Sequence, residues 1–356
     1  MPRIDELLRE AVQAGASDLH MIPGMPPMHR IRGDLYPTNH EARSHATNKE
    51  FFFEILTPEQ RTRLESNLEL DRAYEVEGCG RFRSNFFYGR RGVSGVFRAI
   101  PSKIMPLEEL AMPDGINKML DIRAGLVLVT GPTGCGKSTT LASMIDQINR
   151  TQEKHIITIE DPLEFAHTNR KSLVTQREVG SHAKSFADAL KVASREDPDI
   201  IMVGEMRDLE TISLALTCAE LGILVFGTLH TNSAVKTIDR IINVFPANQQ
   251  NQIRTMLSDS VKAILSQQLL KTADGKGRCA AAEILLCSQA VANMIRESKL
   301  TQIHSIIQTG SGEGMQTMDQ ALQKLVNEKR ITPEAAYFKA LDKSIFADQC
   351  ADPTLE

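Results

Sequence analysis

The chain contains no tryptophan, and only 5% of its residues are aromatic. Proteins that move along single-stranded nucleic acid stack bases on aromatic side chains. The 41 basic and 45 acidic side chains give a formal net charge of −4, so no global positive field attracts nucleic acid or an anionic membrane. The composition therefore argues against a nucleic-acid partner.

Long apolar runs are absent as well. The longest, Gly125–Val129 and Leu221–Phe226, are far shorter than the roughly 20 residues that a membrane span needs. The N-terminal segment MPRIDELLRE carries charges throughout and lacks the apolar centre of a secretory signal. The 6 cysteines are scattered without a CxxC pair or clustered histidines, so the sequence suggests neither a zinc site nor a disulfide framework. We expect a soluble cytoplasmic protein with no direct membrane insertion.

The length of 356 residues, 42% of them hydrophobic, is enough for two ordinary domains. Apolar residues from Ile4 to Ala11 recur at helical spacing, and Arg81–Phe87 and Gly92–Arg98 read as two strands joined by a tight turn. We predict a small α+β domain over residues 1–100, a linker over 101–106 and a second domain over 107–356.

The second domain alternates between short apolar runs and amphipathic stretches, which predicts an α/β fold with parallel strands and right-handed crossovers. The runs are continuously apolar, as expected of strands covered on both faces. We expect strands at 126–130, 155–160, 200–203 and 223–228, and helices at 137–149, 186–194 and 209–221. From Gln250 onward we expect a mostly helical region, with one buried face formed by Ile253, Met256, Leu257, Val261, Ile264 and Leu265.

A phosphate-binding motif, GxxxxGK[ST], follows the first of these strands and opens the first helix. Its glycines let successive backbone N–H groups point at a phosphate, and the helix N-terminus adds a partial positive charge. Lys137 would neutralise the β and γ phosphates of ATP, and the Ser138 hydroxyl would help to hold Mg²⁺. The nucleotide-binding residues that we predict here are Gly131, Pro132, Thr133, Gly134, Cys135, Gly136, Lys137, Ser138 and Thr139.

Carboxylates follow two other predicted strands. Glu205 comes after the strand 200–203, with Gly204 where such motifs usually have an aspartate, and Glu160, Asp161 and Glu164 close the strand before it. The carboxyl ends of parallel strands are where open α/β sheets bind their ligands. One acid can activate water and another can hold Mg²⁺ through water, although any single one could instead cap a helix or lie in solvent. The Mg²⁺ candidates are Ser138, Glu205, Glu160 and Asp161.

Two further residues belong to this region. His230 follows the strand 223–228, so it should reach the same edge of the sheet, where it could donate to the γ-phosphate; alternatively it is a satisfied structural histidine. Cys135 lies inside the loop near a helix N-terminus, which can lower the pKa of a thiol. Alternatively, Cys135 is a small filler residue.

Taken together, these residues resemble the secretion-ATPase superfamily, and most of all the PilT family of type IV pilus retraction motors. The resemblance covers nearly the whole chain. It rests on ASDLH at 16–20, RFRSNFF at 81–87, VFRAIPSKI at 96–104, and four ordered boxes that correspond to Walker A, the Asp box, Walker B and the His box.

The resemblance implies a PAS-like N-terminal domain joined to a RecA-like ATPase domain, six copies of which form a ring. It implies that Arg81, Arg83 and Arg98 reach the phosphates when the site closes, by the bidentate grip of guanidinium on phosphate. Which of them touches ATP stays open, and each could be a surface ion pair instead.

The same resemblance makes Glu164 a candidate for activating water and Glu205 for the Mg²⁺ and γ-phosphate environment, with the division between them left open. Lys137 and His230 complete the catalytic candidates. Arg195 and Arg207 flank the Walker B strand and are candidates to hold these acids.

The implied function is ATP-driven retraction of type IV pili, which powers twitching motility. The implied partners are a PilC-like platform protein in the inner membrane and a PilU-like paralogue, at the cytoplasmic base of the pilus. Assembly-type relatives usually carry an extra N-terminal domain and a four-cysteine zinc insertion, and the lack of both favours retraction.

One segment departs from the family pattern. The family's AIRNLIRE segment corresponds to Ala290–Glu297 here, with Ala292 in place of an arginine.

The alternative functions are a PilU-like accessory motor, a pilus-assembly or type II secretion ATPase, a RecA-like nucleic-acid translocase, and a non-catalytic ATP sensor.

Overall fold

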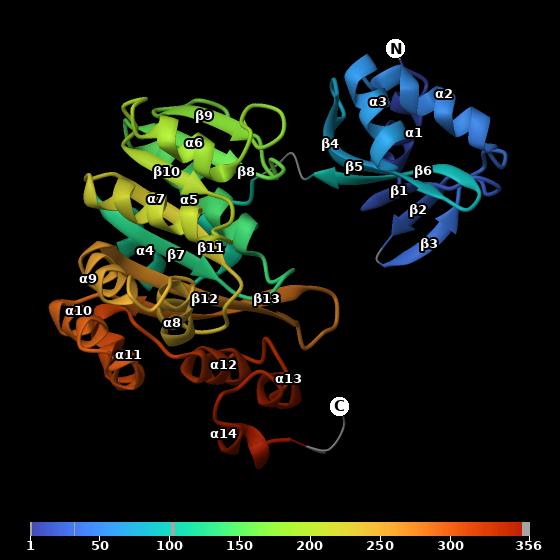
Figure 1. Cartoon of the computed structure of the whole chain (residues 1–356). Coiled ribbons are helices and arrows are strands. Elements are labelled where there is room, and N and C mark those ends of the chain that lie inside the picture. The colour runs from blue at the N-terminus through green and yellow to red at the C-terminus, as the bar shows by residue number, and fades with distance from the viewer. Residues whose placement is uncertain (1, 32, 101–103, 351–356) are drawn as a thin grey trace. The chain divides into compact units, whose positions relative to one another are not determined.

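A computed structural model of the chain describes residues 2–31, 33–100 and 104–350 (Figure 1). The chain divides into two compact units, one of residues 1–103 with 162–166 and the other of residues 104–161 with 167–356. Residues 101–103 of the predicted linker lie outside the described residues.

The first unit is built on an antiparallel sheet with the strand order β3-β2-β1-β6-β5-β4. Its strands are β1 (Asp18–Met21), β2 (Met28–Ile31), β3 (Asp34–Pro37), β4 (Glu69–Val76), β5 (Gly80–Gly89) and β6 (Gly92–Ile100). Its helices are α1 (Ile4–Gln13), α2 (His45–Ile55) and α3 (Pro58–Asn67). The predicted strand pair is confirmed as β5 and β6, and the predicted apolar stripe as the buried face of α1.

One core lies between the three helices and one face of this sheet. The rings of Phe52 on α2, Phe86 on β5 and Phe97 on β6 pack with centroids 5.1 to 6.0 Å apart, and such pairs stabilise a core by about 0.5–1.5 kcal/mol each beyond the area that they bury. Side chains of a strand alternate between faces, so the helices cover the face of these phenylalanines, and the other face of the sheet carries the arginines of β5 and β6.

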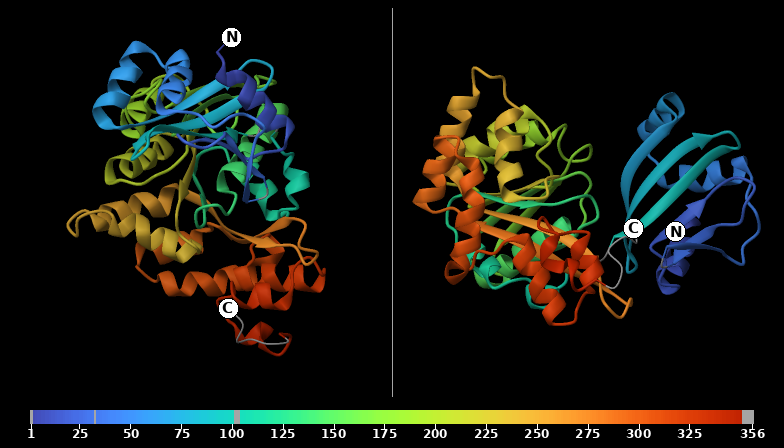
Figure 2. Two further views of the ribbon diagram at one scale, coloured as in Figure 1. Left: turned by 90° about the vertical axis from the view of Figure 1, so that its right-hand side faces the viewer. Right: turned by 90° about the horizontal axis from the view of Figure 1, so that it is seen from below.

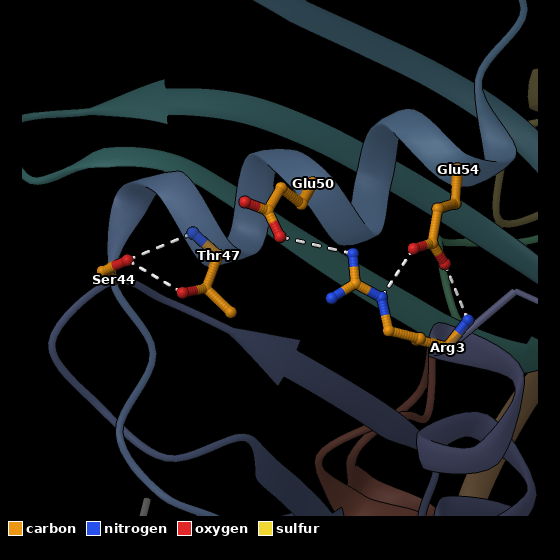
Figure 3. Close-up of polar contacts among 5 residues, drawn as sticks. All are labelled: Arg3, Ser44, Thr47, Glu50 and Glu54. Atoms are coloured by element: carbon orange, nitrogen blue, oxygen red, sulfur yellow. Dashed lines mark hydrogen bonds and ion pairs between the residues drawn. The ribbon is translucent and has the colours of Figure 1, made fainter.

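The start of α2 illustrates how local sequence fixes a helix end (Figure 3). The Ser44 hydroxyl accepts the N–H of Thr47 at 3.1 Å, which satisfies a donor that the first turn would otherwise leave unpaired. Further along α2, Arg3 bonds Glu50 at 3.4 Å and Glu54 at 2.6 Å, four residues apart on one face of the helix. Because these ion pairs are exposed, solvent screens them, and the phenylalanine core holds the unit together.

The second unit is built on a sheet with the strand order β13-β12-β7-β11-β10-β8-β9. Its strands are β7 (Gly125–Thr130), β8 (His155–Glu160), β9 (Leu173–Glu178), β10 (Ile200–Val203), β11 (Leu224–Leu229), β12 (Val261–Lys271) and β13 (Arg278–Leu286). Only β13 runs antiparallel to its neighbour, and the other pairs are parallel. The four strands and three helices predicted between residues 126 and 228 are all present, which confirms the α/β prediction.

Helices cover both faces of this sheet (Figure 2). Val127 and Val129 of β7 face one core, shared with α4 (Gly115–Leu120) and α5 (Lys137–Thr151). Leu126 and Leu128 face the other, whose helices are α6 (Phe186–Ala193), α7 (Leu209–Glu220), α8 (Ala234–Asn243), α9 (Gln250–Ser260), α10 (Gln289–Arg296) and α11 (Ile303–Thr309). A smaller cluster packs β12 and β13 against α12 (Met318–Asn327), α13 (Pro333–Tyr337) and α14 (Ser344–Ala347).

The prediction of a mostly helical region after Gln250 is wrong in part. Helix α9 ends at Ser260, and the next eleven residues form β12, which pairs with β7. A strand buried on both faces is continuously apolar, and a short apolar run of this kind cannot be told from a buried helix by its periodicity. Strands β9 and β13 were not predicted either. Within the described residues, no helix combines the length and apolar character that crossing a membrane requires.

Candidate functional site

The phosphate loop joins β7 to α5, in the strand–loop–helix arrangement that its motif requires. Gly131, Gly134 and Gly136 have φ angles of +147°, +78° and +91°, which only glycine adopts readily. A Cβ atom at Gly131 would lie 2.3 Å from the carbonyl oxygen of Gln267. No side chain of a described residue caps the N-terminus of α5, so the N–H groups of its first turn suit an anion. The loop therefore fits a phosphate chain.

Lys137 lies against the loop. Its Nζ donates to the carbonyls of Gly131 at 2.9 Å and Pro132 at 3.1 Å, and it lies 3.5 Å from Nδ1 of His230. Because an ammonium group only donates, Nδ1 accepts and Nε2 carries the hydrogen. Nε2 then donates to Oε1 of Glu205 at 2.8 Å. This tautomer is assigned from the partners, and it makes the imidazole the link between Lys137 and Glu205.

Glu205 continues the same chain of contacts. Its Oε2 pairs with Arg207 at 2.5 Å, and its side chain is 18% exposed. Burial raises the pKa of Glu205, but the bonds from Arg207 and His230 outweigh burial and hold this pKa below its ordinary value. The side chain is therefore a carboxylate at neutral pH. We call Lys137, His230, Glu205 and Arg207 the rim of the site, because they follow β7, β11 and β10 at the carboxyl edge of the sheet.

The structure explains the glycine in the Walker B position. A Cβ atom at Gly204 would lie 3.2 Å from the carbonyl oxygen of Ile159 and 3.3 Å from Cα of Glu160, which is tighter than most side chains accept. Glu160 is itself buried at the end of β8, where it accepts a hydrogen bond from the Thr158 hydroxyl at 2.7 Å. Glu160, at the end of β8, therefore supplies a carboxylate next to Gly204, where the motif usually has an aspartate.

The candidate Mg²⁺ ligands form no complete cage. The described residues include no group of three or more His, Cys, Asp or Glu side chains that could hold a metal. Mg²⁺ commonly takes one or two protein oxygens and completes its shell with phosphates and water. The hydroxyl of Ser138 and the carboxylates of Glu160, Asp161 and Glu205 are hard oxygen donors of the right kind, so the residues present fit this mode. Asp161 is exposed and its charge contributes to raising the pKa of Arg207, after the larger effect of Glu205.

The remaining predicted residues belong to the first unit. Arg83 and Arg98 are direct cross-strand partners, and Arg81 lies two residues from Arg83, so all three share the face of the sheet opposite the helices. Nε of Arg98 bonds the buried carboxylate of Asp18 at 2.8 Å. Glu164 is exposed and lies in the segment 162–166 that groups with this unit. The approach of these four predicted residues to a phosphate stays a prediction.

Arg207 pairs with Glu205 as anticipated, whereas Arg195 forms no ion pair with either acid among the residues that the structure places. The expectation that the helix terminus lowers the pKa of Cys135 is wrong: the thiol is buried, and burial raises its pKa against the smaller opposing effect of Lys137. The structure favours the filler interpretation of this cysteine.

The sequence analysis missed a second set of contacts, on the side of the loop that faces β12. Gln267 donates from Nε2 to the carbonyl of Cys135 at 2.7 Å and accepts at Oε1 from the Thr140 hydroxyl at 2.8 Å. Next to it, the hydroxyls of Ser266 and Thr130 lie 2.8 Å apart. We call Gln267, Ser266, Thr130 and Thr140 the floor of the site. The available signal was the polar sequence Ser-Gln-Gln inside an apolar run.

A family model described as type II/IV secretion system protein matches residues 1–337. The chain belongs to this family. This membership agrees with the predicted secretion-ATPase fold.

Similar members of the type II/IV secretion system family include three curated proteins. The chain is 52% identical to the type IV pilus retraction ATPase PilT of Pseudomonas aeruginosa over 337 residues, which cover 95% of this chain and 98% of PilT. It is 54% identical over 314 residues to a twitching motility protein of Neisseria gonorrhoeae, covering 88% and 84%. It is 41% identical over 332 residues to the type IV pilus ATPase PilU of Pseudomonas aeruginosa, covering 93% and 87%.

A solved structure gives the same result at the level of the fold. The crystal structure of the pilus retraction motor PilT with bound ADP aligns with a TM-score of 0.90 and 47% identity, covering 96% of this chain and 98% of that one. The predicted resemblance to the PilT family is thereby confirmed.

Proposed function

We propose that this chain is an ATPase that powers the retraction of type IV pili and so twitching motility. The observation that carries the proposal is the phosphate loop whose Lys137 is linked through His230 to Glu205, in a chain 52% identical to PilT over nearly its full length. The ADP bound to the PilT crystal structure supports a nucleotide as the ligand.

The residues of the loop bind the phosphates. The backbone N–H groups of Gly134, Gly136 and the first turn of α5 surround the anion, and Lys137 exchanges its two loop carbonyls for phosphate oxygens. Ser138 would help to hold Mg²⁺, Glu205 would contribute through water, and Glu160 and Asp161 are further candidates. When bound, Mg²⁺ neutralises charge on the β and γ phosphate oxygens.

We infer a division of roles between the two candidate acids, and the contacts of the rim support it. Glu205 accepts two charge-assisted bonds, and its lowered pKa makes it a weak proton acceptor. It therefore orients His230 and serves the Mg²⁺ environment. This assignment leaves Glu164 as the base that takes the proton from the attacking water. The N–H group at Nε2 of His230 remains hydrogen-bonded to Glu205.

The arginines of the first unit sense the nucleotide. Arg81, Arg83 and Arg98 share one face of their sheet, and guanidinium groups there grip a triphosphate more strongly than a diphosphate. Loss of the γ-phosphate then releases these arginines from the nucleotide. Six copies in a homohexameric ring, at the cytoplasmic base of the pilus, transmit this movement to a PilC-like platform protein.

A second candidate is an accessory motor that works beside a retraction ATPase. It is favoured by Ala292 in the family's AIRNLIRE segment: this residue lies on α10, is 9% exposed and replaces an arginine. The 41% identity to the type IV pilus ATPase PilU also supports this second candidate.

Deletion of the gene from its own organism tests the proposal. We expect many surface pili and no twitching, restored by the wild-type gene but not by a gene encoding Lys137→Ala. Loss of all surface pili would indicate an assembly ATPase and refute retraction. Piliated cells that still twitch at a reduced rate would indicate the accessory motor.

A further inference from the structure

One side chain on β12, outside the phosphate-binding motif, forms hydrogen bonds with the phosphate loop and the helix that follows it. Gln267 lies on β12 and is 3% exposed. Both of its side-chain bonds go to the loop or to the first turn of α5: to the carbonyl of Cys135 at 2.7 Å and from the hydroxyl of Thr140 at 2.8 Å. Its own carbonyl oxygen lies against Gly131. One residue thus contacts the beginning, the end and the following turn of the loop.

The bond to Cys135 has a consequence for the next N–H group. A peptide unit is planar and trans, so the carbonyl of Cys135 and the N–H of Gly136 point in opposite directions. Holding the carbonyl toward β12 turns the N–H of Gly136 away from β12, toward the interior of the loop. This N–H is among those that the motif supplies to a phosphate.

We propose that Gln267 is a positioning residue for phosphate binding, which orients the Cys135–Gly136 peptide so that its N–H faces the nucleotide. The inference rests on the proposed ATPase function. It goes beyond that function by assigning part of the phosphate affinity to a strand outside the motif.

A buried glutamine must satisfy its amide in any case, so a role limited to stability is the competing explanation. The neighbouring residue offers a matched control. Gln268 lies on the same strand with its side chain on the opposite face, it is half-buried, and its side chain makes no hydrogen bond with a described residue. Substitutions at the two positions alter the same strand, but only the side chain of Gln267 contacts the loop.

The first test compares Gln267→Met with Gln268→Met in the full-length protein, by titrating a fluorescent ADP analogue and ATP. Methionine preserves the length of the side chain without donating or accepting. Because the loop N–H contacts phosphates that ADP and ATP share, we expect Gln267→Met to raise both Kd values by about tenfold, the value of one charge-assisted hydrogen bond. The value of kcat at saturating ATP should stay within about twofold, as for uniform binding. Gln268→Met should leave both Kd values unchanged.

A second variant covers the case in which Gln267→Met does not fold. In Gln267→Glu the new carboxylate still accepts from Thr140 but cannot donate to the Cys135 carbonyl. When protonated it can do both, and burial favours the protonated form. We therefore expect the Kd for ADP, relative to wild type, to be raised at pH 8 and to recover toward wild type at pH 6. A role limited to stability would not produce this recovery.

The outcomes separate the two hypotheses. If wild-type protein binds ADP and the Gln267 variants bind it equally well, with only a lower melting temperature, the positioning role is refuted and the proposed function stands. If wild-type protein binds neither ADP nor ATP, the proposed function itself fails. A pH-independent loss of affinity in Gln267→Glu would also contradict the positioning role.

Discussion

The two sides of the phosphate loop differ in chemistry. The rim joins Lys137, His230 and Glu205 by charged contacts, and the His230 side chain is 43% exposed. The floor joins Gln267 to the loop and Ser266 to Thr130 by neutral contacts that are buried. Groups that exchange partners during a reaction need access to ligand and water, whereas groups that fix a backbone need shielding from both. The comparison indicates that the rim serves turnover and the floor serves geometry.

The energetics support this division. The ion pairs of Glu205 with Arg207 and His230 are partly exposed and contribute about 0–1 kcal/mol each, so these contacts of the rim add little to stability. Buried neutral hydrogen bonds contribute about 1 kcal/mol each, and leaving one partner unpaired costs about 1–3 kcal/mol. Rim variants should therefore lose turnover while keeping their melting temperature, and floor variants should lose stability or affinity while keeping kcat.

The largest effect is expected at the rim, for Lys137→Ala. Removal of the ammonium group should lower the rate of phosphate release by about 10²–10³ or more, since it stabilises charge that develops in the transition state. The melting temperature should change by less than about 3 °C, roughly 1 kcal/mol for a domain of this size. Steady-state phosphate release and thermal unfolding measure the two quantities. A large loss of stability with normal turnover would reverse the comparison.

The next largest effect distinguishes the two acids. Glu164→Gln should lower kcat by about 10²–10⁴ with nucleotide binding intact, because glutamine cannot accept the proton of the attacking water. Glu205→Gln, the matched control, retains the size of the side chain and should lower kcat less. Single-turnover hydrolysis together with ATP titration separates binding from chemistry. A Glu164→Gln enzyme that hydrolyses ATP at the wild-type rate would remove that residue from the mechanism.

On the floor, Thr130→Val should lower stability with little effect on turnover. The substitution preserves shape but leaves the buried Ser266 hydroxyl without the partner at 2.8 Å, at a cost of about 1–3 kcal/mol. Urea denaturation gives the free energy of unfolding, and kcat should remain within about twofold of wild type. Unchanged stability would mean that Ser266 finds another partner.

The smallest effect concerns pH. The folded-state pKa of Glu205 is lowered, so its ionised form stabilises the fold above its unfolded pKa of about 4.3, and this contribution is lost as pH falls through the folded pKa. The difference in unfolding free energy between wild type and Glu205→Gln should therefore be at most about 1 kcal/mol at pH 7 and should shrink by pH 4. Denaturation curves at both pH values measure it, and a difference that grows on acidification would contradict the lowered pKa.

The sequence predicted the rim better than the floor for a physical reason. Each rim residue directly follows an apolar strand, and parallel strands present their carboxyl ends at one edge, so Glu205, His230 and Lys137 could be brought together without coordinates. Gln267 and Cys135 are far apart in the sequence. Their hydrogen bond depends on the pairing of β12 with β7. Strand order of this kind is not encoded in local periodicity.

The same distinction explains the other differences. The apolar run from Val261 to Leu270 fits a helix and a buried strand equally well, so only its partner β7 decides. Glycine is unusual at position 204 of this motif. The structure explains it, because the backbone of Ile159 and Glu160 leaves little room for a side chain there. The arginines of the first unit were predicted as a set by resemblance, and the shared face of β5 and β6 follows from their register.

The central claim is that this chain hydrolyses ATP at the phosphate loop. The most direct test is phosphate release by the purified full-length protein, with its ring and smaller assemblies assayed separately across a range of Mg²⁺ concentrations. We predict steady turnover that requires Mg²⁺. An absence of ATP consumption in every fraction and at every Mg²⁺ concentration would contradict the account.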